Sequence, residues 1–557
     1  MNDLISIYCK NNKKTYKDIH PGISMTELFK AKGIDGLKYQ PTNVSVNNRI
    51  ENLDFRCWES ADVEFLDYSS PSGLRTFVRS LCFVFLKAAK DVLPGVDMNL
   101  EHSISKGYYA VAHDGHKIPE ESIAAIKQRM QEIIDADIPF IRHRIRTKEA
   151  ISLFRKCGMP DKAELIETAG MAYTTYYELD GYCNYFYECL LPSTGCINLF
   201  DLVPYFHGML LRVPKQTNIN ELEPLIRQDK MFAAYEEHLT LLNALHLDNV
   251  GDLNQAVRAG ASKKVILVSE AMQEKQISSI AEEIARRYKE GVRLVLISGP
   301  SSSGKTTTCK RLEVQLATNL LNPIGISLDD YFVNRDQTPK DEYGDYDFES
   351  IYALDLPKLN EDLDALLAGK EIDIPTYDFT TGKRVYKGKK LKLEDRAVIV
   401  MEGIHALNPI LTEQLPDSAK FRIYVSALTT ISLDNHNWIP TTDNRLLRRI
   451  VRDYRYRGYS AKETIARWHS VRKGEDKWIF PFQENADAMF NSAMLYELAA
   501  LRPFAEPILL EVMEDEPEYA EAHRLLKFLR YFNYMPEENL PRTSLLREFV
   551  GGGSFSY

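Results

Sequence analysis

Residues 299–306 read Gly-Pro-Ser-Ser-Ser-Gly-Lys-Thr and follow the apolar run Arg293–Ser298. The glycines let the backbone curl so that successive N–H groups point at phosphate oxygens, at the positive end of the helix that Lys310–Leu316 predicts. This is the Walker A pattern in its strand–loop–helix setting. The sequence therefore predicts a nucleoside-triphosphate site in which Lys305 reaches the β- and γ-phosphates and the Thr306 hydroxyl suits Mg²⁺.

The region around this loop alternates apolar strands with helical segments. Such alternation predicts an α/β fold with a doubly wound parallel sheet, whose ligands lie at the carboxyl ends of the strands. The predicted strands are 293–298, 323–328, 397–401 and 421–425.

Length and composition limit the possible classes of protein. A chain of 557 residues predicts about three or four domains. The net charge of −10 argues against a general nucleic-acid coat, which needs a broad basic face. The N-terminus shows no secretory signal, and the longest apolar runs are too short for a membrane span. The eight cysteines lack C-x-x-C spacing. We therefore expect a cytoplasmic protein with reduced thiols and no membrane partner.

Changes of pattern along the chain predict five units. Residues 1–66 read as a small α+β module of strands around one helix. Residues 67–225 hold two amphipathic helices, near 75–92 and 120–134, and aromatic strands within 173–187. A helical connector (226–290) leads to the parallel-sheet region (291–515), and a helical tail (516–557) follows.

Carboxylates follow two of the predicted strands. Asp329 and Asp330 come after the second strand, and Glu402 comes after the third. A carboxylate after the second strand can accept a proton from an attacking hydroxyl, and one after the third can orient Mg²⁺ through water. An Asp at a strand end can equally be a turn or helix cap, but the Walker A loop in the same sheet favours the catalytic interpretation.

The segment 442–458 is unusually rich in arginine. On a helix, four arginines share one face and the apolar residues take the other. This pattern is typical either of a solvated basic face or of a lid whose guanidinium groups neutralise a transferring phosphoryl group. The almost exclusive use of Arg favours the lid. The arginines of that face are Arg445, Arg448, Arg449 and Arg452.

Residues 290–495 resemble the uridine kinase/phosphoribulokinase family of P-loop kinases. Besides the Walker A loop, the resemblance rests on Ser327-Leu-Asp-Asp-Tyr-Phe332, Tyr377-Asp-Phe379 and Met401-Glu-Gly-Ile-His-Ala406. It implies ATP and Mg²⁺ as cofactors, with Mg²⁺ on Thr306 and Glu402. It places the nucleotide on Gly299, Ser301, Ser302, Ser303, Gly304, Lys305, Thr306, Thr307, Arg445 and Arg457.

The same resemblance assigns the remaining roles. It implies that Asp329 is the general base and that Asp347 holds the sugar hydroxyls. Tyr377 and Phe379 correspond to aromatic residues that wall the nucleoside site. Lys305, Arg449 and Arg452 correspond to catalytic cations, and Arg449 also contacts the substrate.

Three positions depart from the pattern of uridine and cytidine kinases. Gly382 stands where those kinases carry a His that reads the pyrimidine edge. Phe332 replaces a Tyr of the second motif, and Tyr459 replaces an Arg after the arginine-rich segment. The resemblance thus supports phosphorylation of a sugar hydroxyl but leaves the choice of base open.

The N-terminal half resembles threonyl-tRNA synthetases. Residues 1–66 are similar to their TGS-type β-grasp domain, through 47–53 and 61–65. Residues 73–213 are similar to the adjoining editing domain, through 102–109, 164–167 and 191–195. That domain carries H-x-x-x-H and C-x-x-x-H pairs, and the corresponding positions here hold residues that cannot ligate zinc or act as bases. These are Arg79, Phe83, Phe186 and Leu190.

We therefore expect an ATP-dependent kinase that acts on a nucleoside or a related sugar. The acceptor could instead be a purine nucleoside or a pentose phosphate. Another alternative is a translation-linked regulatory NTPase that binds tRNA through 1–225. An RNA-binding protein with a vestigial kinase domain is disfavoured by the full set of carboxylates. Homo-oligomerisation is possible, and the sequence leaves RNA contact by the N-terminal half open.

Overall fold

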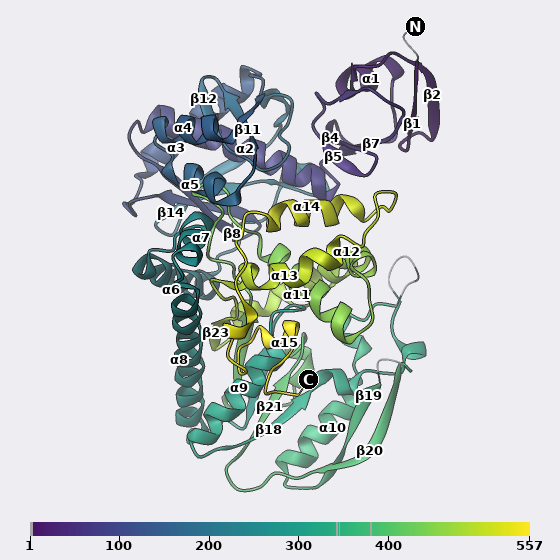
Figure 1. Ribbon diagram of the computed structural model, residues 1–557. Coiled ribbons are helices and arrows are strands. Elements are labelled where there is room, and N and C mark those ends of the chain that lie inside the picture. The colour runs from purple at the N-terminus through teal and green to yellow at the C-terminus, as the bar shows by residue number, and fades with distance from the viewer. Residues whose placement is uncertain (1–3, 341–343, 345, 379–380, 557) are drawn as a thin grey trace.

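The computed structural model describes residues 4–340, 344, 346–378 and 381–556. The sheet that carries the 299–306 loop has five parallel strands in the order β18-β21-β17-β22-β23 (Figure 1). The central strand, β17, is buried along its whole length, as expected for a parallel sheet covered on both faces. The predicted α/β fold class is confirmed. The strands are β17 (Leu294–Ser298), β18 (Asn322–Ser327), β21 (Ala397–Glu402), β22 (Lys420–Ser426) and β23 (Ala488–Asn491).

Helices connect and cover these strands. The helix predicted after the phosphate loop is α9, which begins at Lys305 and packs against the long connector helix α8 (Ser262–Tyr288). An antiparallel hairpin, β19 (Ile372–Asp378) with β20 (Lys383–Leu391), lies outside the parallel sheet and was not predicted. The helices are α9 (Lys305–Thr318), α10 (Leu356–Leu367), α11 (Thr441–Tyr456), α12 (Ala461–Trp478) and α13 (Glu497–Leu509).

The first unit is a five-stranded mixed sheet with one helix, as predicted. Its order is β2-β1-β7-β4-β5, in which β1 and β7 are parallel and the other neighbours are antiparallel. The helix α1 (Met25–Lys32) begins with a capping box formed by Ser24 and Glu27. The strands are β1 (Ile5–Cys9), β2 (Lys14–Ile19), β4 (Pro41–Val46), β5 (Arg49–Glu51) and β7 (Ala61–Asp67), with a short pair β3 (Ile23–Ser24) and β6 (Arg56–Cys57).

The second unit contains the two predicted helices, α2 (Pro71–Val92) and α3 (Glu120–Asp135). They pack on a four-stranded antiparallel sheet of order β13-β14-β9-β8. A second sheet, β10-β11-β12, includes the aromatic strands, whereas helices α4 and α5 were not predicted. The remaining elements are β8 (Met98–Ile104), β9 (Gly107–Ala112), β10 (Ile141–Arg146), α4 (Thr147–Lys156), α5 (Pro160–Ala169), β11 (Tyr173–Leu179), β12 (Tyr182–Asn184), β13 (Asp201–Tyr205), β14 (Gly208–Arg212), β15 (Pro214–Lys215) and β16 (Asn218–Leu222).

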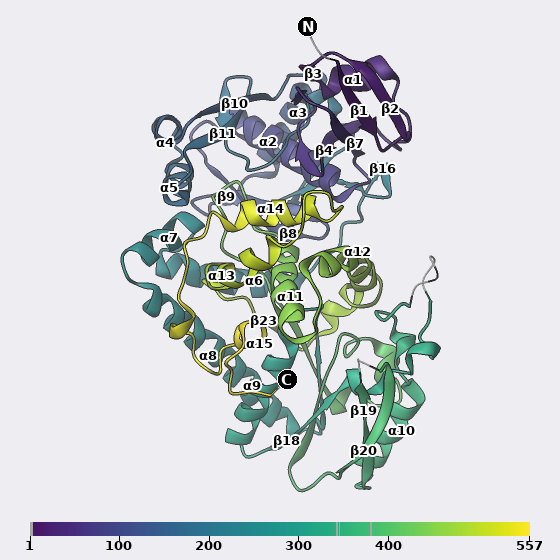
Figure 2. The ribbon, with the colours of Figure 1, turned by 45° about the vertical axis from the view of Figure 1, so that its right-hand side comes forward.

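The connector and the C-terminal segment join the two halves of the molecule. Helix α14 lies between the N-terminal units and the helices of the parallel-sheet region in both ribbon views (Figures 1 and 2). The chain then returns to the phosphate loop, where α15 packs on α11. Among the described residues, no helix combines the length and apolarity needed to cross a bilayer. The helices are α6 (Asp229–Leu245), α7 (Val250–Arg258), α8 (Ser262–Tyr288), α14 (Tyr519–Leu529) and α15 (Arg547–Val550).

Candidate active site

The phosphate loop connects the central strand β17 directly to α9. Gly304 has φ +83°, a left-handed conformation that favours glycine, and a Cβ added there would lie 2.8 Å from Leu545 Cδ2. Helix α9 then begins at Lys305, and the first N–H groups of an α-helix point away from its own carbonyl ladder toward a bound anion. The Lys305 ammonium donates to the Pro300 carbonyl at 3.1 Å. The loop therefore has the anion-binding form that its sequence predicts.

Arginines of α11 hold the loop from one side. Arg445 Nε donates to the Ser301 carbonyl at 2.9 Å, and Arg448 Nη1 donates to the Ser302 carbonyl at 3.3 Å. Both guanidinium groups are buried, and they pair with Glu475 and Glu497 respectively.

This burial corrects the expectation that all of these arginines belong to a movable lid. The cost of leaving a buried carboxylate unpaired fixes Arg445 and Arg448 in place. Arg445 supports the loop through the Ser301 backbone, and its contact with a nucleotide stays a prediction.

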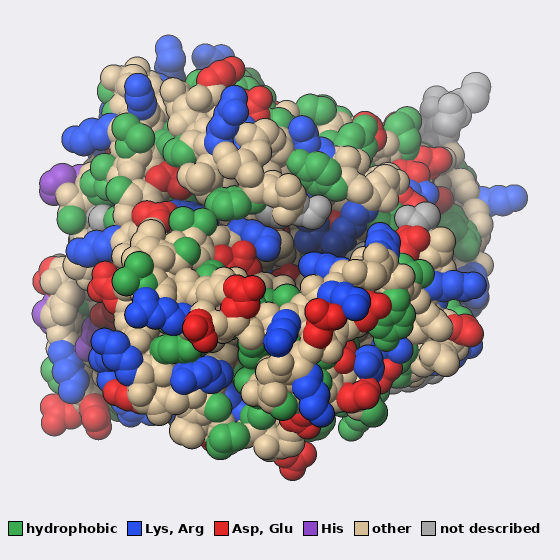
Figure 3. Space-filling model, turned by 90° about the horizontal axis from the view of Figure 1, so that it is seen from below, with side chains coloured by type: hydrophobic (Ala, Val, Ile, Leu, Met, Phe, Trp, Pro, Cys, Tyr) green, Lys and Arg blue, Asp and Glu red, His purple; other side chains and the backbone are tan. Residues whose placement is uncertain are grey.

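The other predicted arginines gather around a single carboxylate. Arg449, Arg452 and Arg457 lie 3.2, 2.7 and 3.7 Å from Asp453 oxygens, and Arg449 also donates to Ser301 Oγ at 2.9 Å. Repulsion from Arg452, with burial, lowers the pKa of Arg457 to about 10. Three guanidinium groups around one carboxylate form a cationic cluster of the kind that can contact a phosphate. The face seen in Figure 3 is also hollowed near its middle, and Lys and Arg side chains gather in the hollow.

The two aspartates after β18 point to different surroundings. The strand ends at Ser327, and both residues lie in a 3₁₀ turn, Leu328–Tyr331, rather than at the end of the strand itself. Asp330 Oδ1 accepts the Tyr377 N–H at 3.2 Å, and burial raises the pKa of Asp330. Asp329 instead lies close enough to Lys305 and Glu402 to act on the pKa of each. Asp329 is thus within electrostatic reach of Lys305 and Glu402, whereas the Asp330 carboxylate holds the backbone of the hairpin.

Glu402 and two hydroxyl groups form an oxygen-rich group beside the loop. Thr306 Oγ1 and Ser327 Oγ donate to Glu402 Oε1 at 3.4 and 3.3 Å. Burial, followed by repulsion from Asp329, raises the pKa of Glu402 to about 7, although Lys305 opposes this shift. Mg²⁺ prefers such oxygen ligands, and a cation would relieve the repulsion between the two carboxylates. The residues predicted to bind Mg²⁺, Thr306 and Glu402, therefore fit that ion.

The predicted acceptor residues lie around the β19–β20 hairpin and the 346–350 segment. The ring of Tyr377 packs 5.5 Å from that of Phe332, centroid to centroid. Asp347 Oδ1 accepts the N–H of Glu349 at 3.2 Å, a contact within its own segment. Phe379, also predicted to wall the site, lies outside the described residues.

Two further glutamates reach this site, and sequence reasoning missed both. Glu475 of α12 accepts the Ser301 N–H at 3.0 Å and pairs with Arg445 and Arg472. Glu349 packs against Gly474, and burial, followed by repulsion from Glu475, raises the pKa of Glu349 to about 7. Glu349 could have been found from its place two residues after Asp347. Nothing in the sequence around Glu475 signals its contact with a loop 174 residues away.

The four positions that correspond to the editing site lie together in the second unit. Phe83 and Phe186 rings are 5.3 Å apart, centroid to centroid, and both pack in one buried apolar cluster with Leu190. Arg79 donates to the Cys189 carbonyl at 3.2 Å and pairs with Glu188. None of these four side chains is a zinc ligand.

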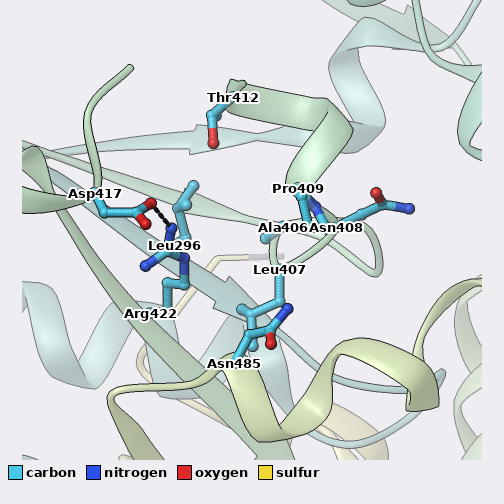
Figure 4. A pocket seen from close by; sticks show the side chains of 9 residues that line it. All are labelled: Leu296, Ala406, Leu407, Asn408, Pro409, Thr412, Asp417, Arg422 and Asn485. Atoms are coloured by element: carbon cyan, nitrogen blue, oxygen red, sulfur yellow. Dashed lines mark hydrogen bonds and ion pairs between the residues drawn. The ribbon is translucent and has the colours of Figure 1, made fainter. Parts of the chain in front are cut away.

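A separate pocket of about 360 Å³ opens on the parallel-sheet region. Asp417 and Arg422 form an ion pair on its wall, and Leu296 of β17 contributes to its floor (Figure 4). None of the described residues that the sequence assigns to nucleotide, metal or acceptor binding lines it. Because it is separate from the phosphate loop, we assign it no part in phosphoryl transfer.

A parallel sheet with a phosphate loop, grouped guanidinium groups and a facing carboxylate defines a P-loop phosphotransferase-type domain. Residues 294–498 match the Phosphoribulokinase / Uridine kinase family. A uridine kinase of Ureaplasma urealyticum serovar 10 is 31% identical over 197 residues, which are 35% of this chain and 85% of that kinase. The chain belongs to this family of kinases, whose members generally use ATP and Mg²⁺.

The N-terminal half is similar to a different class of protein. Threonine–tRNA ligase of Syntrophotalea carbinolica is 30% identical over 220 residues, which are 36% of this chain. The chain spans only 34% of that ligase's length.

Among solved structures, the chain is similar to a possible uridine kinase from Bacillus stearothermophilus. The two are 18% identical, and the match covers 39% of this chain and 98% of that one, with a TM-score of 0.27.

Proposed function

We propose that the protein transfers the γ-phosphate of ATP to a sugar hydroxyl of a nucleoside. The observation that carries this proposal is the grouping of Asp329 with Lys305 and Glu402 beside the phosphate loop. Asp329 accepts the proton of the attacking hydroxyl, and Lys305, Arg449 and Arg452 neutralise the charge that develops on the phosphoryl oxygens.

The nucleotide and its metal ion would be held by residues already described. Backbone N–H groups from Gly299 to Thr307 hold the phosphates, and Arg457 supplies further positive charge. Thr306 and Glu402 would hold Mg²⁺, which neutralises phosphate charge when bound. Asp347, Tyr377 and Phe379 are proposed to position the sugar and base, with Glu349 as an additional carboxylate on the acceptor side.

The proposed base-reading region around Gly382 lies against Arg335. A Cβ at Gly382 would lie 2.7 Å from Arg335 Nε, so the Arg335 side chain lies against that position. The Arg335 N–H also donates to the Gly382 carbonyl at 2.8 Å. A guanidinium has only donors, whereas a neutral histidine ring offers a donor and an acceptor. The acceptor choice is therefore proposed to differ from that of uridine kinases.

An assay of ADP release over a panel of nucleosides and pentose phosphates tests this function. We expect at least one nucleoside to be phosphorylated, without strong preference for uridine or cytidine over every purine nucleoside. The reason is that strong discrimination needs polar groups that pair with the substrate edge, and three such groups are replaced. A roughly thousandfold preference for pyrimidines would contradict the acceptor proposal. Turnover with pentose phosphates alone would favour the alternative acceptor.

A second candidate function is tRNA binding through the N-terminal half. It is favoured by the similarity to a threonine–tRNA ligase and by a basic edge strand, β10. Arg142, Arg144 and Arg146 alternate along this exposed strand, and the Arg144 guanidinium lies 5.2 Å from the centroid of the exposed Tyr173 ring. Such a combination of cations and an aromatic ring suits an RNA backbone and its bases.

Titration of labelled tRNA with the full chain tests this second function. We expect the charge-reversed variant R142E/R144E to bind several-fold more weakly, because each contact to a phosphate is lost. K148E/K156E, at two exposed lysines of the neighbouring helix α4, makes the same change in net charge and serves as the control. Equal affinity of the two variants and the wild type would show that β10 is not an RNA surface.

A further inference from the structure

Residues 540–550 pack directly on the start of α9. Their apolar side chains belong to the same buried cluster as Leu312 of that helix. Leu545 lies against Gly304 of the phosphate loop, as the 2.8 Å approach to an added Cβ shows. The apolar residues of the segment that are buried in this cluster are Leu540, Leu545, Leu546, Phe549 and Val550.

The segment also contacts the loop through a shared arginine. The Arg448 guanidinium lies 5.0 Å from the Phe549 ring centroid while donating to the Ser302 carbonyl. Cation–π contact with a buried ring strengthens when water is excluded. The loop, α11 and the 540–550 segment therefore form one packed unit around the phosphate-binding backbone.

One acidic side chain of this segment enters the loop itself. Glu548 Oε2 accepts the Thr307 N–H at 3.3 Å and the Thr307 hydroxyl at 2.6 Å. Glu548 is only 8% exposed, and its charge is close enough to Lys305 and Glu402 to act on the pKa of each. The Thr307 N–H belongs to the first turn of α9, where N–H groups and the helix dipole favour an anion.

We propose that Glu548 occupies a phosphate position of the nucleotide site when no nucleotide is bound, so that ATP must displace it. This inference rests on the proposed binding of ATP to the loop. A phosphate and a carboxylate cannot share the Thr307 donors, because two anions so close together repel each other. Only the molecules in which Glu548 has left the Thr307 donors can bind the triphosphate, and the apparent association constant is the intrinsic constant multiplied by the fraction of such molecules.

A simple helix cap would predict something different. If Glu548 only satisfied the Thr307 N–H, replacing it would cost some stability and would leave ATP affinity unchanged or weaker. Displacement predicts the opposite, because the neutral amide of E548Q keeps the shape of the side chain but gives up the charge that competes with phosphate. The two interpretations therefore differ in the sign of the change in ATP affinity.

The test is calorimetric titration of the full chain with a non-hydrolysable ATP analogue and Mg²⁺, without acceptor. We expect E548Q to bind roughly tenfold more tightly than the wild type, the size expected for one charge-assisted hydrogen bond. E538Q, which removes an exposed carboxylate two residues before this segment, should bind like the wild type. The melting temperature of each free variant verifies that it is folded.

The outcomes separate this inference from the proposed function. Equal or weaker binding by a folded E548Q variant overturns the displacement of Glu548 and supports a helix cap. Absence of analogue binding by both E548Q and the wild type overturns the proposed function and this inference together. Tighter binding by E548Q supports the inference, whatever acceptor the enzyme phosphorylates.

Discussion

Asp329→Asn should lower kcat by about 10²–10⁴-fold, the usual contribution of a general base. Asparagine keeps the shape of the side chain but cannot accept the hydroxyl proton. Asp329 lies within electrostatic reach of Lys305 and Glu402, where the phosphoryl group would be transferred. ATP binding should survive, because the phosphate loop is unchanged. ADP release at saturating acceptor measures the first expectation, and calorimetric titration with an ATP analogue measures the second.

Asp330→Asn is the matched control for this substitution. Asp330 accepts the Tyr377 N–H and so supports the hairpin rather than the phosphoryl group. We expect kcat to fall less in the Asp330 variant than in the Asp329 variant. If Asp330→Asn abolished turnover while Asp329→Asn stayed within a few-fold of the wild type, the assignment of the base would be wrong.

The second large effect concerns a buried ion pair between the two halves of the chain. Lys162 of α5 lies 2.6 Å from Asp434, and both side chains are 0% exposed. Lys162→Met removes the cation and leaves Asp434 buried without a partner of opposite charge at that distance. Breaking such a pair costs about 3–5 kcal/mol. The urea midpoint of unfolding of the full chain should therefore fall well below that of the wild type, and K156M, an exposed lysine on α4, should change it little.

The pH dependence of this loss has a definite sign. Burial raises the pKa of Asp434 in the wild type, while Lys162 opposes that shift. Without Lys162 the pKa of Asp434 in the folded protein rises further above its unfolded value. A raised carboxyl pKa contributes stability at low pH, and that stability is lost as the pH rises through the folded pKa. The difference in free energy of unfolding between the wild type and K162M should thus grow with pH. A difference that shrinks as the pH rises would contradict this account.

The sequence predicts those features that are determined by residues close together along the chain. The phosphate loop, the strand before it and the helix after it are encoded within 293–316, so their fold followed from one motif. The approach of Asp329 and Glu402 to the loop followed from parallel strands that end at one edge of the sheet. The N-terminal sheet likewise followed from short alternating strands around one helix.

Contacts between distant segments could not be predicted in this way. A run of charged residues usually faces solvent, so nothing in the sequence predicts buried arginines on α11. Arg445 and Arg448 are buried because α12 and α13 pack on α11 and supply glutamates that pair with them. The β19–β20 hairpin was not predicted because β19 contains Pro375 and β20 is rich in lysine, and both residue types are uncommon in strands. The contact between Thr307 and Glu548 joins residues 241 positions apart, and no local pattern specifies it.

That last separation has a consequence for biosynthesis. A ribosome that adds roughly 5–20 residues per second needs on the order of 10–50 s to pass from Thr307 to Glu548. Throughout that interval the nascent chain holds a phosphate loop without the carboxylate that occupies it in the finished protein. Leu545 and Phe549 are also missing, so the core beneath the loop is incomplete. Under the proposed displacement of Glu548, ATP that binds the growing polypeptide would not compete with this carboxylate, as it would in the finished protein.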